Sequence, residues 1–281
     1  MPSIDPTALA QELMAAYTGR QSIDVPPSGR GEGFDLTAAY AVEAELVRLR
    51  RAAGRTTVGR KVGFANKAMW RVLKLETLVW AHMYDDTVHD AENGAATVSL
   101  ARMYSPKIEP EIVFRLKRPL ASAGLEAPAV LDAVEWLALG FEIIDCLFPD
   151  WTFQPADFVA SFGLHAALVV GERRTVTPEM IPALVEQLPR FKVRLLKNGE
   201  LVEEGSGKNS LRSPALCLGE LAAGIARQPD AEPLSAGELI SSGTLTTSYP
   251  IAAGETWRAE VEGIDLPDLT ISLGPRSAGT V

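Results

Sequence analysis

The stretch Ile108-Glu-Pro-Glu-Ile-Val-Phe114 holds two carboxylates, Glu109 and Glu111, inside an otherwise apolar run. A run of this kind is typical of a strand, and a strand sends residues i and i+2 to the same face. Glu109 and Glu111 are therefore expected to point the same way. Two adjacent carboxylates on an inner face repel each other and lose hydration, so they must be neutralised, protonated or bound to a cation.

A third carboxylate, Glu142, lies in a second apolar run, Gly140-Phe-Glu-Ile-Ile-Asp145. Oxygen ligands select a hard divalent ion, so three such carboxylates predict a site for Mg²⁺ or Mn²⁺. The alternative is a solvated face of an antiparallel sheet, and Pro110 is compatible with an edge strand because proline cannot donate to a ladder. Glu142 would then cap a helix or form an ion pair. The residues alone leave both interpretations open.

Composition excludes several classes of function. The chain has 281 residues, of which 47% are hydrophobic, and a net charge of −9. That length predicts one large domain, alone or with a small accessory part. The acidic balance argues against a nucleic-acid partner, which requires a basic surface. No targeting signal or membrane-length apolar run is visible, and Cys146 and Cys217 form no CxxC motif, so we expect a cytoplasmic protein with free thiols and no membrane partner.

The order of the apolar patterns predicts an α+β fold that is mostly β. Helical patterns cover residues 5–20 and 36–53, which defines a helical N-terminal region, 1–56. Short apolar runs separated by turn residues then predict a β body over 57–281. We expect Asn198-Gly199 to form a hairpin turn.

Two helices are expected to interrupt the β body. The first covers about 128–138, where Val130, Val134 and Leu137 have helical spacing. The second begins at Ser213-Pro214, a capping residue followed by proline, and runs to about Ala226.

Four further places along the chain carry candidate chemistry. Lys61, in Gly59-Arg-Lys-Val-Gly-Phe64, is either a surface lysine or, beside a cation, a general base. Asp85 and Asp86 form a turn or orient a proton or a water molecule. The segment Ser242-Gly-Thr244 is either a plain turn or a donor of hydrogen bonds to an anion. His165 lies in a mostly apolar run that favours a buried core histidine.

Several motifs occur in a fixed order along residues 25–273. They are Gly59-Arg-Lys-Val-Gly-Phe64, Met83-Tyr-Asp-Asp-Thr-Val88, Pro106-Lys-Ile-Glu-Pro-Glu-Ile-Val-Phe114, Phe141-Glu-Ile-Ile-Asp145 and Leu239-Ile-Ser-Ser-Gly-Thr244. Together they resemble the 2-oxo-4-pentenoate hydratase and 4-oxalocrotonate decarboxylase branch of the fumarylacetoacetate hydrolase superfamily. The resemblance implies a β-roll body, homo-oligomers and a role in aromatic catabolism. It also implies a Mg²⁺- or Mn²⁺-dependent lyase that acts on a small 2-oxo acid through an enolate, most simply a hydratase.

The resemblance assigns roles to individual residues. It implies metal ligands at Glu109, Glu111 and Glu142, catalytic residues at Lys61 and Asp86 with Asp85 as the alternative, and substrate contacts at Gly243 and Thr244. One departure affects the reaction. Where the hydratases carry Asp-Asn-Ala-Ser near the substrate, this chain has Phe158-Val-Ala-Ser-Phe-Gly-Leu-His165, which makes His165 a further candidate for substrate binding. Decarboxylation, hydrolysis of an acylpyruvate C–C bond and a non-catalytic metabolite-binding role therefore stay open beside hydration.

Overall fold

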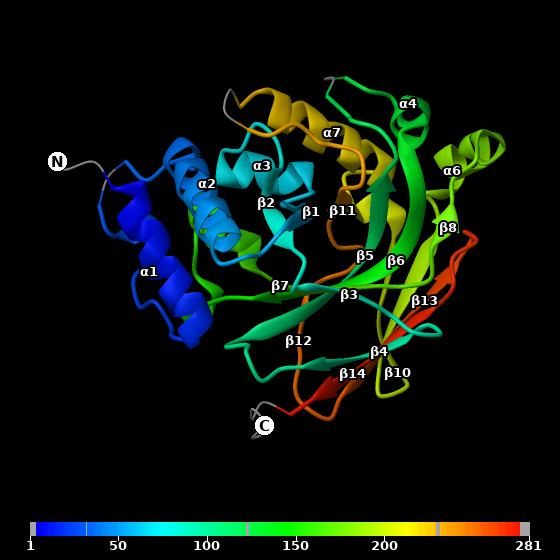
Figure 1. Ribbon diagram of the computed structural model, residues 1–281. Helices are drawn as coiled ribbons and strands as arrows, with labels where there is room; N and C mark the ends of the chain where they lie inside the picture. The colour runs from blue at the N-terminus through cyan, green and yellow to red at the C-terminus, as the bar shows by residue number, and fades with distance from the viewer. Residues whose placement is uncertain (1–3, 32, 122–123, 229–230, 276–281) are drawn as a thin grey trace.

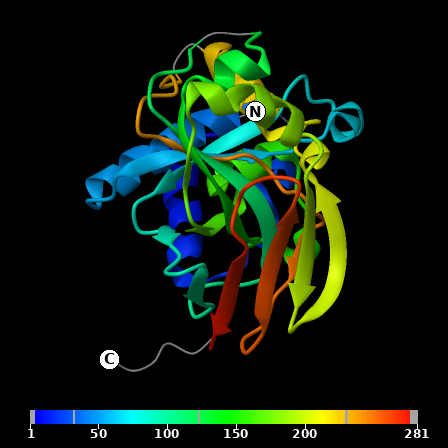
Figure 2. The same cartoon turned by 90° about the vertical axis from the view of Figure 1, so that its right-hand side faces the viewer.

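The computed structural model describes residues 4–31, 33–121, 124–228 and 231–275, and within them the strands form two sheets. Figure 1 shows helices α1 and α2 on one side of the larger sheet, with the smaller sheet of β4, β9, β10, β13 and β14 on the other. Figure 2 turns the smaller sheet toward the viewer. The expected fold class, a mostly β body with helices at the N-terminus, is confirmed.

The larger sheet has nine strands among the described residues. Seven follow the order β2-β1-β11-β5-β6-β7-β3, while β12 pairs with β5 and β8 pairs with β6. Their bounds are β1 Thr57–Gly63, β2 Val79–Tyr84, β3 Val88–Asp90, β5 Pro106–Leu116, β6 Val134–Asp145, β7 His165–Val170, β8 Arg174–Thr175, β11 Leu239–Ser241 and β12 Tyr249–Pro250.

The smaller sheet has five strands among the described residues, in the order β10-β9-β13-β14-β4. Their bounds are β4 Ala95–Ser99, β9 Lys192–Lys197, β10 Glu200–Ser206, β13 Thr256–Glu262 and β14 Leu269–Gly274. The predicted Asn198-Gly199 hairpin joins β9 to β10, and both turn residues have positive φ, 52° and 86°. An Asn-Gly pair suits this turn because both residues tolerate the left-handed conformation.

The α-helices of the described residues are α1 Pro6–Gly19, α2 Leu36–Ala52, α3 Lys67–Leu73, α4 Ala127–Leu131, α5 Pro155–Ala160, α6 Ile181–Gln187 and α7 Pro214–Ala226. Helices α1, α2 and α5 contribute to one apolar cluster beside the larger sheet, and α7 packs into the main core. The expected helices over 5–20 and 36–53 correspond to α1 and α2, and the one after Ser213 corresponds to α7. Among the described residues, none of the helices combines the length and apolar character needed to cross a bilayer.

The expected helix over 128–138 is wrong in its second half. Helix α4 ends at Leu131, and strand β6 begins at Val134. Every residue of β6 except Glu135 is buried, so the strand has no polar alternation. A strand covered on both faces reads as a continuous apolar run, which periodicity cannot distinguish from a buried helix.

Strand β5 is central in the sheet, and its two faces have different roles. Ile108, Ile112 and Phe114 belong to the main apolar core, which includes residues of the smaller sheet and α7. Glu109 and Glu111 project from the opposite face because side chains alternate along a strand. This opposite face turns toward a second apolar cluster, which contains residues of α1, α2 and α5.

Pro110 does not mark an edge strand, because β5 pairs with β6 on one side and with β11 and β12 on the other. The Pro110 carbonyl accepts a hydrogen bond from Leu245 N at 2.8 Å, on the side away from β6. The missing N–H faces the same side, in the gap between β11 and β12, so the β5–β6 ladder loses no bond.

The proposed boundary between 1–56 and 57–281 stays a prediction. Helices α1 and α2 share their apolar cluster with Phe158 and Ile144 of the body. The N-terminal helices therefore complete the cover over the carboxylate face of the sheet.

Candidate metal centre

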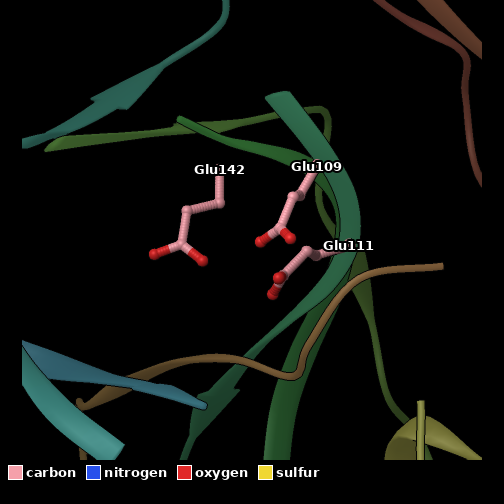
Figure 3. A group of neighbouring side chains, drawn as sticks. All are labelled: Glu109, Glu111 and Glu142. Carbon is pink, nitrogen blue, oxygen red and sulfur yellow. The ribbon is translucent and has the colours of Figure 1, made fainter. Parts of the chain in front are cut away.

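The carboxylates of Glu109, Glu111 and Glu142 converge on one point, as Figure 3 shows. Strand pairing explains the convergence, since Glu109 on β5 lies directly opposite Glu142 on β6, and Glu111 follows two residues later on the same face. One carboxylate oxygen from each residue lies within 4.8 Å of the others. The Glu-x-Glu pair is thus not a solvated face; Glu111 and Glu142 are fully buried and Glu109 is half-buried.

Two oxygens of this cluster lack hydrogen bonds. Among the described residues, Glu111 Oε1 and Glu142 Oε2 are buried without a hydrogen-bond partner. Lys61 Nζ lies 3.1 Å from Glu142 Oε2, an ion-pair distance that falls short of hydrogen-bond geometry. Buried carboxylate oxygens without partners are energetically costly, and a hard divalent cation would relieve that cost. The donor set therefore fits Mg²⁺ or Mn²⁺.

The pKa shifts of the three glutamates indicate that nearby cations do not balance the negative charge of the cluster. Burial raises the pKa of Glu109 to about 7, with Lys61 opposing the shift and Glu142 adding to it. Burial, followed by repulsion from Glu142 and Glu109, raises the pKa of Glu111 well above its ordinary value. Burial acts in the same direction on Glu142, but Lys61 and His165 outweigh it and lower the pKa of that residue. Lys61, together with Lys107 at Glu109 and His165 at Glu142, is thus insufficient to compensate three carboxylates.

Glu111 is oriented by the segment that follows β11. Ser241 Oγ and Gly243 N–H donate to Glu111 Oε2 at 2.6 and 2.8 Å. Gly243 has φ of +90°, and a Cβ there would lie 2.7 Å from Ala65 Cβ, so glycine is required at this turn. The sequence suggested Gly243 and Thr244 as substrate contacts but missed Ser241, for which the only signal was a hydroxyl two residues before the glycine.

Lys61 is buried on β1 and faces Glu142. Its Nζ donates to the Gly163 carbonyl at 2.9 Å and lies 4.7 Å from the centre of the Phe158 ring. A Cβ at Gly163 would approach Lys61 Cδ to 2.6 Å. The residues on either side, Phe162 and Leu164, share its left-handed conformation, with φ of 57° and 55° against 60° for Gly163. Three such residues in succession form a strained turn, which holds the carbonyl against the lysine.

His165 is hydrogen-bonded to the Glu142 carboxylate. Its Nδ1 hydrogen-bonds Glu142 Oε1 at 2.8 Å, and its Nε2 lies 3.0 Å from Thr87 Oγ1. The Thr87 hydroxyl also donates to the Tyr84 carbonyl at 2.9 Å, which fixes its position beside the imidazole. Both ring nitrogens are thus engaged by protein groups. Thr87 was missed from the sequence, where nothing distinguished it from an ordinary turn residue.

Asp86 and Asp85 lie in the turn between β2 and β3, away from the carboxylates. Asp86 forms ion pairs with Arg50 and, at 3.2 Å, with Arg55. Asp85 Oδ1 accepts a hydrogen bond from the Thr56 backbone N–H at 3.2 Å. Neither aspartate belongs to the described residues that line the cavity beside Glu109. The catalytic role expected for Asp86 stays a prediction.

A cavity of about 430 Å³ opens beside the carboxylates. Lys61, Glu109, Gly243 and Thr244 line its inner end, so four of the predicted site residues share one space. Its remaining walls include Trp151, Phe153, Phe158, Glu203, Asn66 and Asn209, none of which the sequence had singled out as a site residue. A larger cavity of about 840 Å³ lies between α2, β2 and the segment after α7, and none of the predicted site residues lines it. The smaller cavity is therefore the candidate site, because it contains the lysine, the carboxylate and the glycine turn that the sequence indicated.

Comparison with known proteins defines the class. The model of the fumarylacetoacetate (FAA) hydrolase C-terminal family matches residues 73–270. The 2-hydroxyhexa-2,4-dienoate hydratase of Comamonas testosteroni is 30% identical over 226 residues, which cover 80% of this chain and 82% of the relative. This chain belongs to the fumarylacetoacetate hydrolase family.

Solved structures give the same result. The 4-oxalocrotonate decarboxylase from Pseudomonas putida G7, complexed with magnesium and adipate, superimposes with a TM-score of 0.85 at 26% identity. That match covers 97% of this chain and 100% of the decarboxylase. The fumarylpyruvate hydrolase from Pseudomonas aeruginosa, in complex with Mn²⁺ and pyruvate, shares the fold, with a TM-score of 0.56 at 16% identity over 78% of this chain and 89% of that one. The β-roll implied by the sequence resemblance is confirmed.

Proposed function

We propose that this protein is a Mg²⁺- or Mn²⁺-dependent hydratase of 2-hydroxypenta-2,4-dienoate, the enol form of 2-oxo-4-pentenoate. The observation that carries the proposal is the cluster of Glu109, Glu111 and Glu142, which has two buried oxygens without a hydrogen bond from any described residue and lies beside a cavity containing Lys61. The hydratase relative supports the reaction, and the magnesium and manganese complexes of the structural relatives support the ion.

The three glutamates would hold the ion through carboxylate oxygens. When bound, the ion would supply a Lewis acid that stabilises negative charge on the 2-oxo group of the substrate. Ser241 and Gly243 keep Glu111 oriented toward the site, and His165 does the same for Glu142. We therefore propose His165 as a positioning residue, in addition to the substrate contact suggested by the sequence. For Gly243 and Thr244, substrate contact is supported by their place in the cavity wall.

Lys61 is proposed to carry protons. Hydration requires the enol hydroxyl proton to be transferred to C5, hydroxide from water to add at C4, and the remaining proton of that water to be transferred to C3. Lys61 is the described cation that lines the cavity, and its side chain is 2% exposed. A positioned amine in a water-poor site can give and take these protons, for a contribution of about 10²–10⁴ in rate.

Asp86 is proposed to act indirectly. Its ion pairs with Arg50 and Arg55 anchor the turn that carries Thr87, and Thr87 hydrogen-bonds His165. The contacts of Asp86 support this indirect role better than the direct orientation of a proton or a water molecule at the reaction site.

Decarboxylation of a 2-oxo acid is the second candidate, and one observation favours it. The structural relative with a TM-score of 0.85 is a decarboxylase. Both reactions require the same stabilised charge on the 2-oxo group, so the carboxylate cluster serves either one. The substrate, not the cluster, distinguishes them.

The test is a pair of assays on the purified protein with Mg²⁺. Loss of the ultraviolet absorbance of 2-hydroxypenta-2,4-dienoate, abolished by a chelator and restored by Mg²⁺ or Mn²⁺, is the expected result. Release of CO₂ from 4-oxalocrotonate without hydration would favour the second candidate. If neither substrate is turned over while pyruvate binds with Mg²⁺, the protein is a metabolite-binding member of the family and the proposal fails.

We also propose a cytoplasmic homo-oligomer. The two free cysteines, Cys146 and Cys217, are buried, which is compatible with a reducing compartment. Light scattering on the purified protein would measure the number of subunits.

A further inference from the structure

The 430 Å³ cavity has a charged end and a mostly uncharged lining. The charged end contains Lys61 and Glu109, beside the other two carboxylates. The lining has an apolar part, which includes Val62, Phe64, Ala65, Ile144, Trp151, Phe153, Phe158 and Leu164, and an uncharged polar part, which includes Asn66, Asn209, Thr246, Thr247 and Ser248. A 2-oxo acid that uses its carboxylate and 2-oxo oxygens at the charged end must lay its remaining carbons against this lining.

Four aromatic rings form a continuous wall along the cavity. The Phe64 and Phe158 ring centres are 5.2 Å apart, those of Phe158 and Phe153 are 6.4 Å apart, and those of Phe153 and Trp151 are 6.4 Å apart. The wall begins at Lys61, whose Nζ lies over Phe158. Aromatic surface favours a planar conjugated or aliphatic tail and offers nothing to a charged one.

The charges along the cavity disfavour a second carboxylate. Among the described residues that line it, Lys61 is the single cation, and it already faces Glu142. Glu203 on β10 adds a negative charge to the lining away from the metal cluster. Its carboxylate is fixed by Thr247, whose N–H and Oγ1 lie 3.0 and 3.4 Å from its oxygens. A substrate with a terminal carboxylate would have that charge desolvated and repelled.

One nearby cation does not line the cavity. Lys107 projects from the same face of β5 as Glu109, and its Nζ lies 3.9 Å from the centre of the Trp151 ring. Lys107 is not among the described residues that line the cavity, although the Trp151 ring that it contacts is. Lys107 is therefore the residue to substitute in a test, because it is the other nearby cation that could bind a terminal carboxylate of the substrate.

We propose that Phe158, Phe153 and Trp151, together with Glu203, select 2-oxo acids whose far end is uncharged and apolar, and reject those that end in a second carboxylate. The inference rests on the proposed function, since it assumes that the 2-oxo acid head lies at the glutamate cluster. It deepens that function by naming the residues that select a monocarboxylic substrate over a dicarboxylic one.

The test compares matched, unreactive probes by calorimetry on the full-length protein with Mg²⁺. Pyruvate has the head alone, 2-oxohexanoate adds an apolar tail, and 2-oxoadipate has the same six carbons with a terminal carboxylate. Each buried methylene is expected to tighten binding roughly fourfold. We expect 2-oxohexanoate to bind about tenfold or more tighter than pyruvate, and 2-oxoadipate to bind no tighter than pyruvate.

Variants separate the two parts of the proposal. Phe153→Ala should remove most of the gain of 2-oxohexanoate over pyruvate and leave pyruvate binding unchanged. Glu203→Gln keeps an acceptor for Thr247 and should tighten 2-oxoadipate severalfold without affecting 2-oxohexanoate. Glu204→Gln is the matched control, because Glu204 is exposed on the same strand and does not line the cavity. It should change neither probe.

The outcomes distinguish this inference from the proposed function. If pyruvate binds with Mg²⁺ but 2-oxoadipate binds tighter than 2-oxohexanoate, the tail preference is wrong, while the 2-oxo acid site at the glutamate cluster stands and the decarboxylase candidate is favoured. Loss of that 2-oxoadipate affinity in Lys107→Met would then identify Lys107 as the reader of the second carboxylate. Absence of Mg²⁺-dependent pyruvate binding would overturn both.

Discussion

Asp157 and Glu111 are both fully buried, but they differ in how completely their carboxylates are hydrogen-bonded. Asp157 Oδ1 accepts from Ser28 N–H, and its Oδ2 accepts from Ser28 Oγ and Gln154 N–H, at 2.5–2.8 Å. Glu111 has two donors on one oxygen and, within the part of the chain that the structure describes, none on the other. The hydrogen bonds of Asp157 are complete and attach the segment around Ser28 to α5. The hydrogen bonds of Glu111 are incomplete, and its free oxygen, beside two more carboxylates, can coordinate a cation. A buried carboxylate thus signals function when its hydrogen bonds are incomplete, not merely when it is buried.

Removal of Lys61 should have the largest effect on turnover. We expect Lys61→Met to reduce the hydration rate about 10³-fold, because no other described cation lines the cavity to move the protons. Metal affinity should stay at the wild-type level or rise, since the ammonium competes for Glu142. Steady-state kinetics and calorimetric titration with Mn²⁺ measure the two. Lys192→Met, on an exposed position of β9, is the control, and wild-type turnover in Lys61→Met would reject the role.

Neutralising the two acids should shift stability in opposite directions. Asp157→Ala removes the acceptor of the Ser28 and Gln154 N–H groups and of the Ser28 hydroxyl, and should lower the free energy of unfolding by about 2 kcal/mol. Glu111→Gln removes a repelled charge and should leave the metal-free protein as stable as wild type, or about 1 kcal/mol more stable. Denaturant unfolding under chelator measures both. Equal losses of unfolding free energy in the two variants would contradict the proposed difference between the two carboxylates.

The metal-free protein should lose stability as pH rises from acid to neutral. The pKa of Glu109 is raised from 4.5 to about 7, so its contribution is complete below 4.5 and is lost as pH passes through 7. The loss from this residue is about 3 kcal/mol at most, and Glu111 shifts in the same direction. Excess Mg²⁺ should flatten the profile. Thermal unfolding between pH 5 and pH 8, with and without Mg²⁺, checks this, and two parallel profiles would count against cation binding at the cluster.

His165 should have the smallest effect. His165→Ala removes the hydrogen bond that orients Glu142 and should weaken Mn²⁺ binding about 10–100-fold, with the ligands themselves intact. Thr87→Val should weaken it less, because Thr87 contacts the imidazole and not the carboxylate. Competition titrations against a metal-sensitive dye give both values. An unchanged affinity in His165→Ala would restrict that residue to packing.

Local rules predicted much of the site but not its long-range parts. The i, i+2 spacing put Glu109 and Glu111 on one face, and the collinear motifs brought in Lys61, Glu142 and Gly243. The register that sets Glu142 opposite Glu109 depends on how β5 pairs with β6, which no local pattern contains. The aromatic wall was hidden for the same reason, since Phe64 and Phe158 are far apart in sequence.

The errors in the fold have a physical cause as well. Val130, Val134 and Leu137 fit a helix, yet β6 begins at Val134 because this strand is covered on both faces and needs no polar alternation. Asp157 gave no signal of its own, since a single acid in an apolar segment resembles an ordinary helix cap until its partners, such as Ser28, are known.

The most direct test of the central claim is a titration of metal-free protein with Mn²⁺, followed by electron paramagnetic resonance. We predict one tightly bound Mn²⁺ per chain in the wild type and none in Glu109→Gln/Glu142→Gln, with far-ultraviolet circular dichroism showing that the double variant is folded. A double variant that retains Mn²⁺ at wild-type affinity would contradict the assignment of the site to these glutamates.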